Sequence, residues 1–312
     1  MHPYLSVVIP VYDEQKALPE LYHRLIAALD SSEISGYEII FVNDGSADSS
    51  MEIILRLRRS DERVKAIELS RNFGHQTALT AGIDNACGDA VILMDADLQD
   101  SPEIIPELVR KWREGYEVVY VIRTRRRENW AKQLAFKFFY RLLRRLSSIK
   151  MPPDAGIFSL ISREVADVLK AMPERNRYIS GLRWWAGFKQ VGVFCQRNRR
   201  FADKPRQTIK RLITLALDAI FSFSYFPLRL STFVGVFVAF FSFAAGLVAV
   251  YLRLSKILII PLGWTSTIVV ISFLSGVILL MLGIVGEYIA RIYDEIKGRP
   301  QYIVRQKIGF KN

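Results

Sequence analysis

Residues 91–100 read Val91-Ile92-Leu93-Met94-Asp95-Ala96-Asp97-Leu98-Gln99-Asp100. The apolar run at the start is typical of a buried strand in a parallel sheet, because such a strand has both of its faces covered. Asp95 and Asp97 follow the run, close enough together to repel each other unless they share a divalent cation. The stretch therefore predicts a central strand of an α/β sheet whose end carries a candidate metal site.

Outward from this stretch, short runs of β-branched and other apolar residues alternate with patterns of helical periodicity. Strands are predicted over residues 5–11, 37–42, 64–69 and 90–94. Helices are predicted over residues 17–30, 49–59, 77–86 and 102–114. Strands that alternate with helices form βαβ units, so the sequence predicts an open, doubly wound, Rossmann-like α/β fold with a mostly parallel sheet.

Polar residues follow each of the four predicted strands. Ligands bind beyond the carboxyl ends of the strands in such a sheet, so these residues are expected to gather at one edge. The alternative for each segment is an ordinary turn and helix cap, with Ser46 or Asp48 capping the next helix. The segments read Pro10-Val11-Tyr12-Asp13-Glu14, Asn43-Asp44-Gly45-Ser46, Ser70-Arg71-Asn72-Phe73-Gly74 and Asp95 to Asp100.

Two long apolar stretches, residues 231–252 and 265–286, contain no charged residue. Each would span roughly 30 Å as a helix, which matches the hydrocarbon core of a bilayer. Two buried core helices are the alternative, although core helices of this length normally carry a polar face. The sequence therefore predicts a hairpin of two transmembrane helices.

The charge distribution around these stretches predicts their orientation. The connection between the two stretches contains only two basic residues, Arg253 and Lys256. No signal-peptide pattern precedes the first predicted strand. By the positive-inside rule, the catalytic part and both termini are expected in the cytoplasm, in a multi-pass protein of the inner (cell) membrane. The flanking basic residues are Arg206, Lys210, Arg211 and Arg229 before the first stretch, and Arg291, Lys297, Arg299, Arg305 and Lys307 after the second.

A net charge of +12 fits contact with anionic membrane lipids, and nucleic acid is not an expected partner. Residues 129–146 predict a basic amphipathic helix on the membrane surface, or alternatively a helix packed on the soluble domain. The predicted organisation is a catalytic domain over residues 1–205, a juxtamembrane interface helix over 206–230, the membrane hairpin over 231–286, and a charged helix and tail over 287–312.

Several motifs in chain order carry a resemblance to a known family. They are Val8-Ile9-Pro10-Val11-Tyr12-Asp13-Glu14, Asn43-Asp44-Gly45-Ser46, Arg71-Asn72-Phe73-Gly74-His75, Asp95 to Asp100 and Gly286-Glu287-Tyr288. With them the sequence resembles the inverting family 2 glycosyltransferases of GT-A fold. Within that family it is similar to the polyprenyl-phosphate glycosyltransferases, which include bactoprenol glucosyltransferases and dolichol-phosphate mannose synthase.

The resemblance implies transfer of a sugar from a nucleotide-sugar donor to undecaprenyl or dolichyl phosphate at the cytoplasmic membrane face. It implies a divalent cation, Mg²⁺ or Mn²⁺, and a homo-oligomer, of which a tetramer is one form. Glucose from UDP-glucose is the expected sugar because the two-span architecture resembles the glucosyl branch.

The resemblance also implies roles for individual residues. It assigns nucleotide-sugar binding to Pro10, Tyr12, Asp13, Glu14, Asp44, Asp95, Arg200 and Arg206. It assigns the metal to Asp95, Asp97 and Gln99, the acceptor phosphate to Arg123, and catalysis to Asp97, Arg123 and Asp154. Arg123 follows a strand predicted over residues 117–122, and Arg126 in the basic loop beyond it is expected to attract the same phosphate, a solvated run of charge being the alternative. A general base is not required, because a phosphate monoester is mostly a dianion at pH 7. The family often reads Gly-Glu-Ser-Lys-Tyr where this chain has Asp203-Lys204-Pro205-Arg206-Gln207.

Two alternative functions share the same catalytic fold. One is a GDP-mannose-dependent polyprenyl-phosphate mannosyltransferase, because the sequence does not identify the sugar. The other is a processive polysaccharide synthase, but such synthases resemble one another in a Gln-x-x-Arg-Trp motif. Here Arg183-Trp184 is preceded by Ser180 at the Gln position, which disfavours that alternative.

Overall fold

The computed structural model describes residues 4–32, 34, 36–124, 155–175, 177–196, 226–255 and 263–310. These residues belong to two compact units. The first holds the described residues up to 196 together with residues 299–310, and the second holds residues 226–255 and 263–298. The predicted amphipathic helix over 129–146 and most of the predicted juxtamembrane helix over 206–230 lie outside the described residues.

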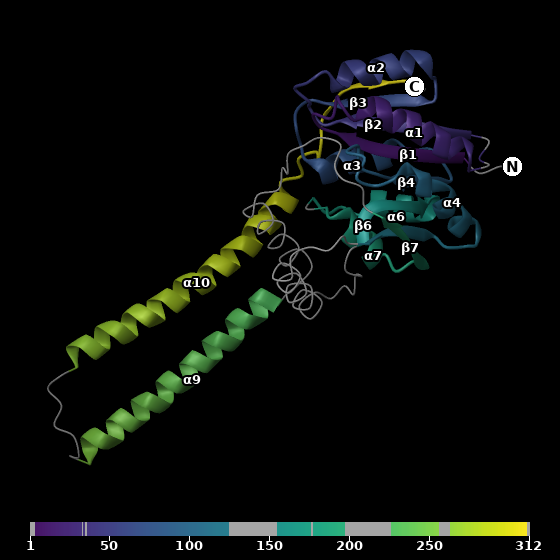
Figure 1. Cartoon of the computed structure of the whole chain (residues 1–312). Coiled ribbons are helices and arrows are strands. Elements are labelled where there is room, and N and C mark those ends of the chain that lie inside the picture. Colours follow the sequence, from purple (N-terminus) through teal and green to yellow (C-terminus); the bar gives the residue numbers. More distant parts are fainter. Residues whose placement is uncertain are drawn as a thin grey trace. The chain divides into compact units, whose positions relative to one another are not determined.

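The first unit is built on an eight-stranded sheet with the order β7-β5-β6-β4-β1-β2-β3-β8 (Figure 1). Strands β1 to β4 run parallel, β5 and β7 run in the same direction, and β6 and β8 run opposite to them. The prediction of an α/β fold with a mostly parallel sheet is therefore confirmed. The strands are β1 Tyr4–Val11, β2 Gly36–Asn43, β3 Val64–Leu69, β4 Ala90–Leu93, β5 Val118–Thr124, β6 Ala155–Ser162, β7 Gln190–Gln196 and β8 Val304–Ile308.

The helices of this unit follow the strands in the βαβ manner. Residues of α1 that face the sheet, such as Leu21 and Leu25, are fully buried at helical spacing, and so is the apolar run of β2. The central strands therefore have both faces covered, which is why their sequences read as continuous apolar runs. The helices are α1 Leu18–Asp30, α2 Ser50–Ser60, α3 His75–Asn85, the 3₁₀ helix η1 Pro102–Ile104, α4 Ile105–Arg113, α6 Arg163–Ala171 and α7 Ile179–Trp185.

The order of the strands reverses between β4 and β1, because the chain builds β1, β2 and β3 in one direction and places β4 on the other side of β1. The β1–β4 pairing is recorded from Leu5↔Ala90 to Val8↔Leu93, whereas β1 continues along β2 to Val11↔Asn43. Pro10 therefore lies beyond the recorded β4 pairing, where its missing N–H costs no bond to that strand. Such a reversal is the usual ligand site of an open α/β sheet.

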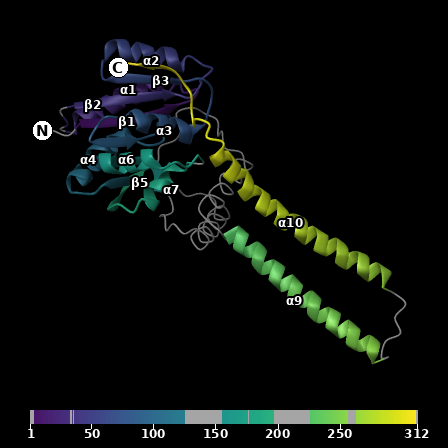
Figure 2. The same cartoon turned by 180° about the vertical axis from the view of Figure 1, so that it is seen from behind.

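The second unit contains two long helices, α9 Phe226–Leu254 and α10 Trp264–Ile296, which run side by side (Figure 2). A Cβ added to Gly235 of α9 would lie 3.8 Å from the Met281 thioether of α10, an ordinary contact distance, so the two helices are in contact range at this point. Within the described residues, one segment, Phe273–Ile296, is long and apolar enough to cross a membrane. The two-span hairpin stays a prediction.

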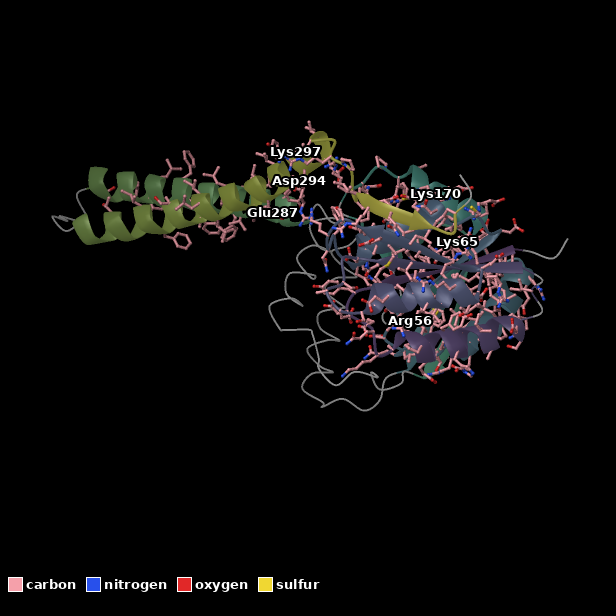
Figure 3. The ribbon with its side chains drawn as sticks, turned by 90° about the horizontal axis from the view of Figure 1, so that it is seen from above. Arg56, Lys65, Lys170, Glu287, Asp294 and Lys297 are labelled. Carbon is pink, nitrogen blue, oxygen red and sulfur yellow. The ribbon has the colours of Figure 1, made fainter. Side chains whose placement is uncertain are left out.

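Helix α10 carries charge near its C-terminal end, where Glu287, Asp294 and Lys297 are labelled in Figure 3. Glu287 accepts a hydrogen bond from Arg291, one turn further along the helix, at 3.1 Å. Gly298 follows with φ +63°, a left-handed conformation that commonly ends helices. The next residues, from Arg299 onward, belong to the first unit, where they form the edge strand β8.

Candidate active site

The loops after β1 and β2 are joined by reciprocal hydrogen bonds. The Asp13 backbone donates to Ser46 Oγ at 3.1 Å, and Asp13 Oδ1 accepts from the Ala47 backbone at 2.8 Å. The Glu14 backbone donates to Ser50 Oγ at 3.0 Å. Asp13 has φ +53°, which is uncommon for a residue with a side chain, so these bonds hold it in a strained conformation. In this conformation the Asp13 carboxylate lies just beyond the end of β1, at the edge of the sheet where the ligand is predicted to bind.

Asp44 joins the loop after β2 to the loop after β3. Its side chain is almost fully buried, and its two oxygens accept hydrogen bonds from the backbone of Phe73 at 2.7 Å and of Gly74 at 2.9 Å. Burial raises the pKa of Asp44, although the two N–H groups and the positive charges nearby favour its ionised form. Asp44 therefore supports the loop after β3 through these two hydrogen bonds.

Gly45 explains why the two loops can lie so close together. It has φ +68°, and a Cβ at this position would lie 2.6 Å from the Arg71 carbonyl carbon and from the Asn72 nitrogen. A side chain here would push the loop of residues 70–74 away from Asp44. In the Asn43-Asp44-Gly45-Ser46 motif, Asp44 thus accepts hydrogen bonds from the loop of residues 70–74, and Gly45 leaves the space that this loop needs.

The acidic segment after β4 alternates between partly exposed and buried side chains. Asp95, Asp97 and Gln99 are partly exposed, while Ala96 and Leu98 are buried. Leu98 has φ +58°, and burial of its side chain holds this uncommon conformation in place. The three residues predicted to bind the metal are therefore the ones that this segment leaves accessible.

His75, the first residue of α3, lies against this segment. Its Nε2 is 2.7 Å from Asp95 Oδ1. Partial desolvation of the ring opposes protonation, but the hydrogen bond and negative charge of Asp95 outweigh it and raise the pKa of His75. No role was predicted for His75 from the sequence, although it closes the Arg71-Asn72-Phe73-Gly74-His75 motif.

The remaining predicted residues are less completely described. Tyr12 is 41% exposed at the end of β1, and Pro10 is buried within β1. Arg123 was predicted to follow a strand over 117–122, but β5 continues to Thr124 and pairs Arg123 with Cys195 of β7. The boundary was wrong because pairing with β7 prolongs the strand. Arg126, Asp154, Arg200 and Arg206 lie outside the described residues.

Arg183 on α7 is a buried cation, and sequence reasoning did not predict its burial. Its Nη2 donates to the Gly156 carbonyl at 3.3 Å, and its guanidinium lies 5.8 Å from the centre of the Tyr120 ring. Burial lowers the pKa of Arg183 to about 10. Its Nε and Nη1 have no hydrogen-bond partner in the part of the chain that the structure describes. A residue on a seven-residue helix gives no periodic signal that could have revealed this burial.

The arrangement around Asp95 and Asp97 suits a hard divalent cation. Among the described residues, no three His, Cys, Asp or Glu side chains form an all-protein metal centre. Mg²⁺ and similar ions usually bind one or two carboxylates and complete their shell with water and substrate phosphates. Two partly exposed carboxylates, with Gln99 two residues further along the same segment, fit that requirement.

Known protein families and individual proteins resemble this chain in sequence. Residues 6–169 match the model of "Glycosyl transferase family 2". An uncharacterized glycosyltransferase of Bacillus subtilis, YkcC, is 45% identical over 100% of this chain and 96% of its own length. A prophage-derived bactoprenol glucosyl transferase of Shigella flexneri is 40% identical over 97% of each chain.

Among solved structures, glucosyl-3-phosphoglycerate synthase from Mycobacterium tuberculosis matches 70% of this chain and 78% of its own, with 18% identity and a TM-score of 0.48. The sheet has the GT-A arrangement expected from the sequence. With its family match and its full-length relatives, the chain belongs to glycosyl transferase family 2 and is a glycosyltransferase.

Proposed function

We propose that this protein transfers a sugar from a nucleotide-sugar to a polyprenyl phosphate, with inversion at the anomeric carbon. The observation that carries the proposal is the accessible Asp95–Asp97 pair beside the strand-order reversal, in a chain that also contains two long apolar helices. Relatives that match along nearly their whole length, at 38–40% identity, are named bactoprenol glucosyl transferases or homologues of them.

On the donor side, Tyr12, Asp13 and Asp44 would bind the nucleoside, with Pro10 and Glu14 shaping the same edge. A carboxylate can accept more than two hydrogen bonds, so Asp44 could accept from a nucleoside in addition to Phe73 and Gly74. Asp95, Asp97 and Gln99 would hold Mg²⁺ or Mn²⁺. When bound, the cation neutralises charge that develops on the leaving diphosphate. Arg200 and Arg206 would add cationic contacts to that diphosphate.

On the acceptor side, Arg123 and Arg126 would hold the lipid phosphate. Because that phosphate is already mostly a dianion at neutral pH, the main task is to align its oxygen with the anomeric carbon. A bond then forms between this oxygen and the carbon as the bond to the diphosphate breaks. Asp154 would orient a sugar hydroxyl or the acceptor, and no proton needs to be removed.

For the membrane part we propose that α9 and α10 both span the bilayer, with the catalytic unit and both termini in the cytoplasm. The exposed apolar side chains of both helices, such as Phe233 and Leu279, support a lipid environment. The basic residues that flank the helices support the orientation. A homo-oligomer, of which a tetramer is one form, completes the proposal.

Glucose from UDP-glucose is the proposed donor sugar, because the relatives named above carry glucosyl names. A GDP-mannose-dependent enzyme and a processive synthase would use the same donor edge. A panel of nucleotide-sugars therefore distinguishes the first alternative, and the size of the product distinguishes the second.

The test uses the full-length protein in lipid, a radiolabelled nucleotide-sugar, a divalent cation and a polyprenyl phosphate, followed by organic extraction. Label in the organic phase that depends on the added lipid phosphate is expected, with UDP-glucose the best donor. A matched reaction with the corresponding dephosphorylated polyprenol controls for partitioning. Label that enters an aqueous polymer, or that never leaves any donor, would refute the proposal.

A further inference from the structure

The C-terminal segment of residues 299–310, here called the strap, packs along the edge of the catalytic sheet. Its strand β8 pairs antiparallel with β3, from Ala66↔Ile308 to Leu69↔Val304 (Figure 1). Lys65 of β3 is labelled in Figure 3, and its ammonium lies 5.0 Å from the centre of the Phe310 ring. The strap is therefore part of the fold of the catalytic unit, although Glu68 and its partner Arg305 are 237 residues apart in the sequence.

The strap also contacts the start of the loop that leads to the site. The Ser70 backbone donates to the Ile303 carbonyl at 2.9 Å. Arg305 donates through Nη1 to Glu68 at 3.2 Å and through Nη2 to the Ser70 carbonyl at 3.3 Å. Both main-chain polar groups of Ser70 are thus bound by the strap. This fixes the point at which the chain leaves β3.

A second group of contacts involves Gln301 and Tyr302, at the N-terminal end of the strap. Tyr302 donates from its hydroxyl to Asp84 Oδ2, near the end of α3, at 2.8 Å. Burial and the negative charge of Asp84 raise the pKa of Tyr302, so this hydroxyl stays protonated and can donate. Gln301 donates to the Glu174 carbonyl at 2.9 Å, which fixes the strap itself.

Residues 70–75 follow the first support directly, and helix α3 connects them to the second support at Asp84. They supply the Phe73 and Gly74 N–H groups to Asp44 and the His75 ring to Asp95. Gly74 has φ +99°, in a conformation open mainly to glycine, and a Cβ there would meet no atom within 4 Å. Packing around Gly74 therefore does not fix the path of the loop, and the support at Ser70 and the anchoring of α3 at Asp84 matter correspondingly more.

We propose that the strap positions this loop for donor binding, with Arg305 and Tyr302 as positioning residues. Neither side chain is among the residues proposed to bind the nucleotide or the metal. Arg305 acts through Ser70 at the start of the loop, and Tyr302 acts through Asp84 of α3, the helix that follows the loop. The effect on donor binding rests on the proposed function. The chain passes from the end of α10 at Ile296 to the strap through Lys297 and Gly298, so the proposed membrane span leads directly into the support of the donor loop.

The experiment compares variants of the full-length protein in lipid. Arg305→Met removes both guanidinium bonds, and Tyr302→Phe removes the hydroxyl bond. Glu68→Gln weakens the ion pair but keeps the Arg305 bond to the Ser70 carbonyl. Lys307→Met is the matched control, because it removes an exposed positive charge from the same strand.

The first readout is hydrogen exchange of the Phe73 and Gly74 amides, which does not depend on any substrate. Arg305→Met and Tyr302→Phe are expected to speed this exchange roughly three- to tenfold, as expected for loss of a bond of ordinary strength. Glu68→Gln and Lys307→Met are expected to leave it close to that of the parent. The global Tm of each variant shows whether the change is local.

The second readout is steady-state kinetics with the best donor. The two strap variants are expected to raise the donor KM several-fold, with kcat and the acceptor KM little changed. Arg305→Lys should restore part of the effect. Unchanged amide exchange in Arg305→Met, or equal exchange in Lys307→Met, would overturn the proposal, as would faster exchange with an unchanged donor KM. If the parent protein transfers no sugar while the exchange pattern holds, the proposed function fails and the support of the loop by the strap stands.

Discussion

Asp44 Oδ1 lies 2.7 Å from the backbone nitrogen of Phe73, and the second carboxylate oxygen of Asp44 binds the next backbone nitrogen. A residue expected from the sequence to bind the nucleoside therefore also supports the loop after β3. The two roles are compatible, since a carboxylate accepts more than two hydrogen bonds. Substitution of Asp44 must consequently affect both the stability of the fold and the geometry of the donor edge.

Asp44→Asn should lower the free energy of unfolding of the catalytic unit by about 1–3 kcal/mol, because the amide NH₂ faces a backbone donor that it cannot accept from. The donor KM should rise at the same time. Chemical denaturation and donor kinetics measure the two effects. Glu62→Gln, at an exposed carboxylate, is the control. A raised KM without loss of stability would contradict the supporting role of Asp44.

Comparing Gly45→Ala with Gly115→Ala should separate two costs of adding a side chain, namely backbone strain at positive φ and a clash with neighbouring atoms. The Cβ would meet the Arg71–Asn72 backbone at 2.6 Å, whereas Gly115 has φ +88° and no atom within 4 Å of its Cβ position. Gly115→Ala therefore carries strain alone. Gly45→Ala should destabilise the fold by about 1–3 kcal/mol more than this control and raise the donor KM. Equal destabilisation by the two substitutions, read from urea midpoints, would show that the close approach of the loops is unimportant.

Local sequence patterns were sufficient to predict strands β1 to β4, because a buried parallel strand reads as one apolar run. They also predicted that the segments after these strands would gather at one edge. They did not reveal the strap, because Arg305 and Glu68 are brought together by a pairing across most of the chain. They likewise missed Arg183, whose burial depends on packing against Tyr120 and Gly156.

Glu103→Gln should produce a small, pH-dependent loss of stability. Arg24 of α1 donates to both oxygens of Glu103 at 2.7 and 2.8 Å, and this hydrogen bonding lowers the pKa of Glu103. A lowered carboxylate pKa adds stability above the unfolded-state pKa, and that stability is lost as the pH falls through the folded-state pKa.

The Glu103 side chain is 55% exposed, so the contribution should stay below about 1 kcal/mol. Thermal unfolding of the parent and of Glu103→Gln should differ at pH 7 and converge as the pH falls below the lowered folded-state pKa of Glu103. Glu107→Gln, on the following helix turn, is the control. A difference in Tm that grows as the pH falls would have the wrong sign for this ion pair.

Asp97→Asn should reduce turnover by about 10²–10³-fold, the loss typical of removing one group that stabilises developing charge. Asp97 is partly exposed and accepts a bond from the Gln99 backbone at 3.2 Å, a bond that an amide oxygen can also accept, so the fold should survive. Removal of divalent metal from the parent by a chelator should give a comparable loss, reversed by Mg²⁺ or Mn²⁺. Asp167→Asn, at an exposed carboxylate on α6, should retain full activity. Turnover by the chelated parent protein would exclude the metal role assigned to Asp95 and Asp97, because the leaving diphosphate would then have to be stabilised by other groups of this chain.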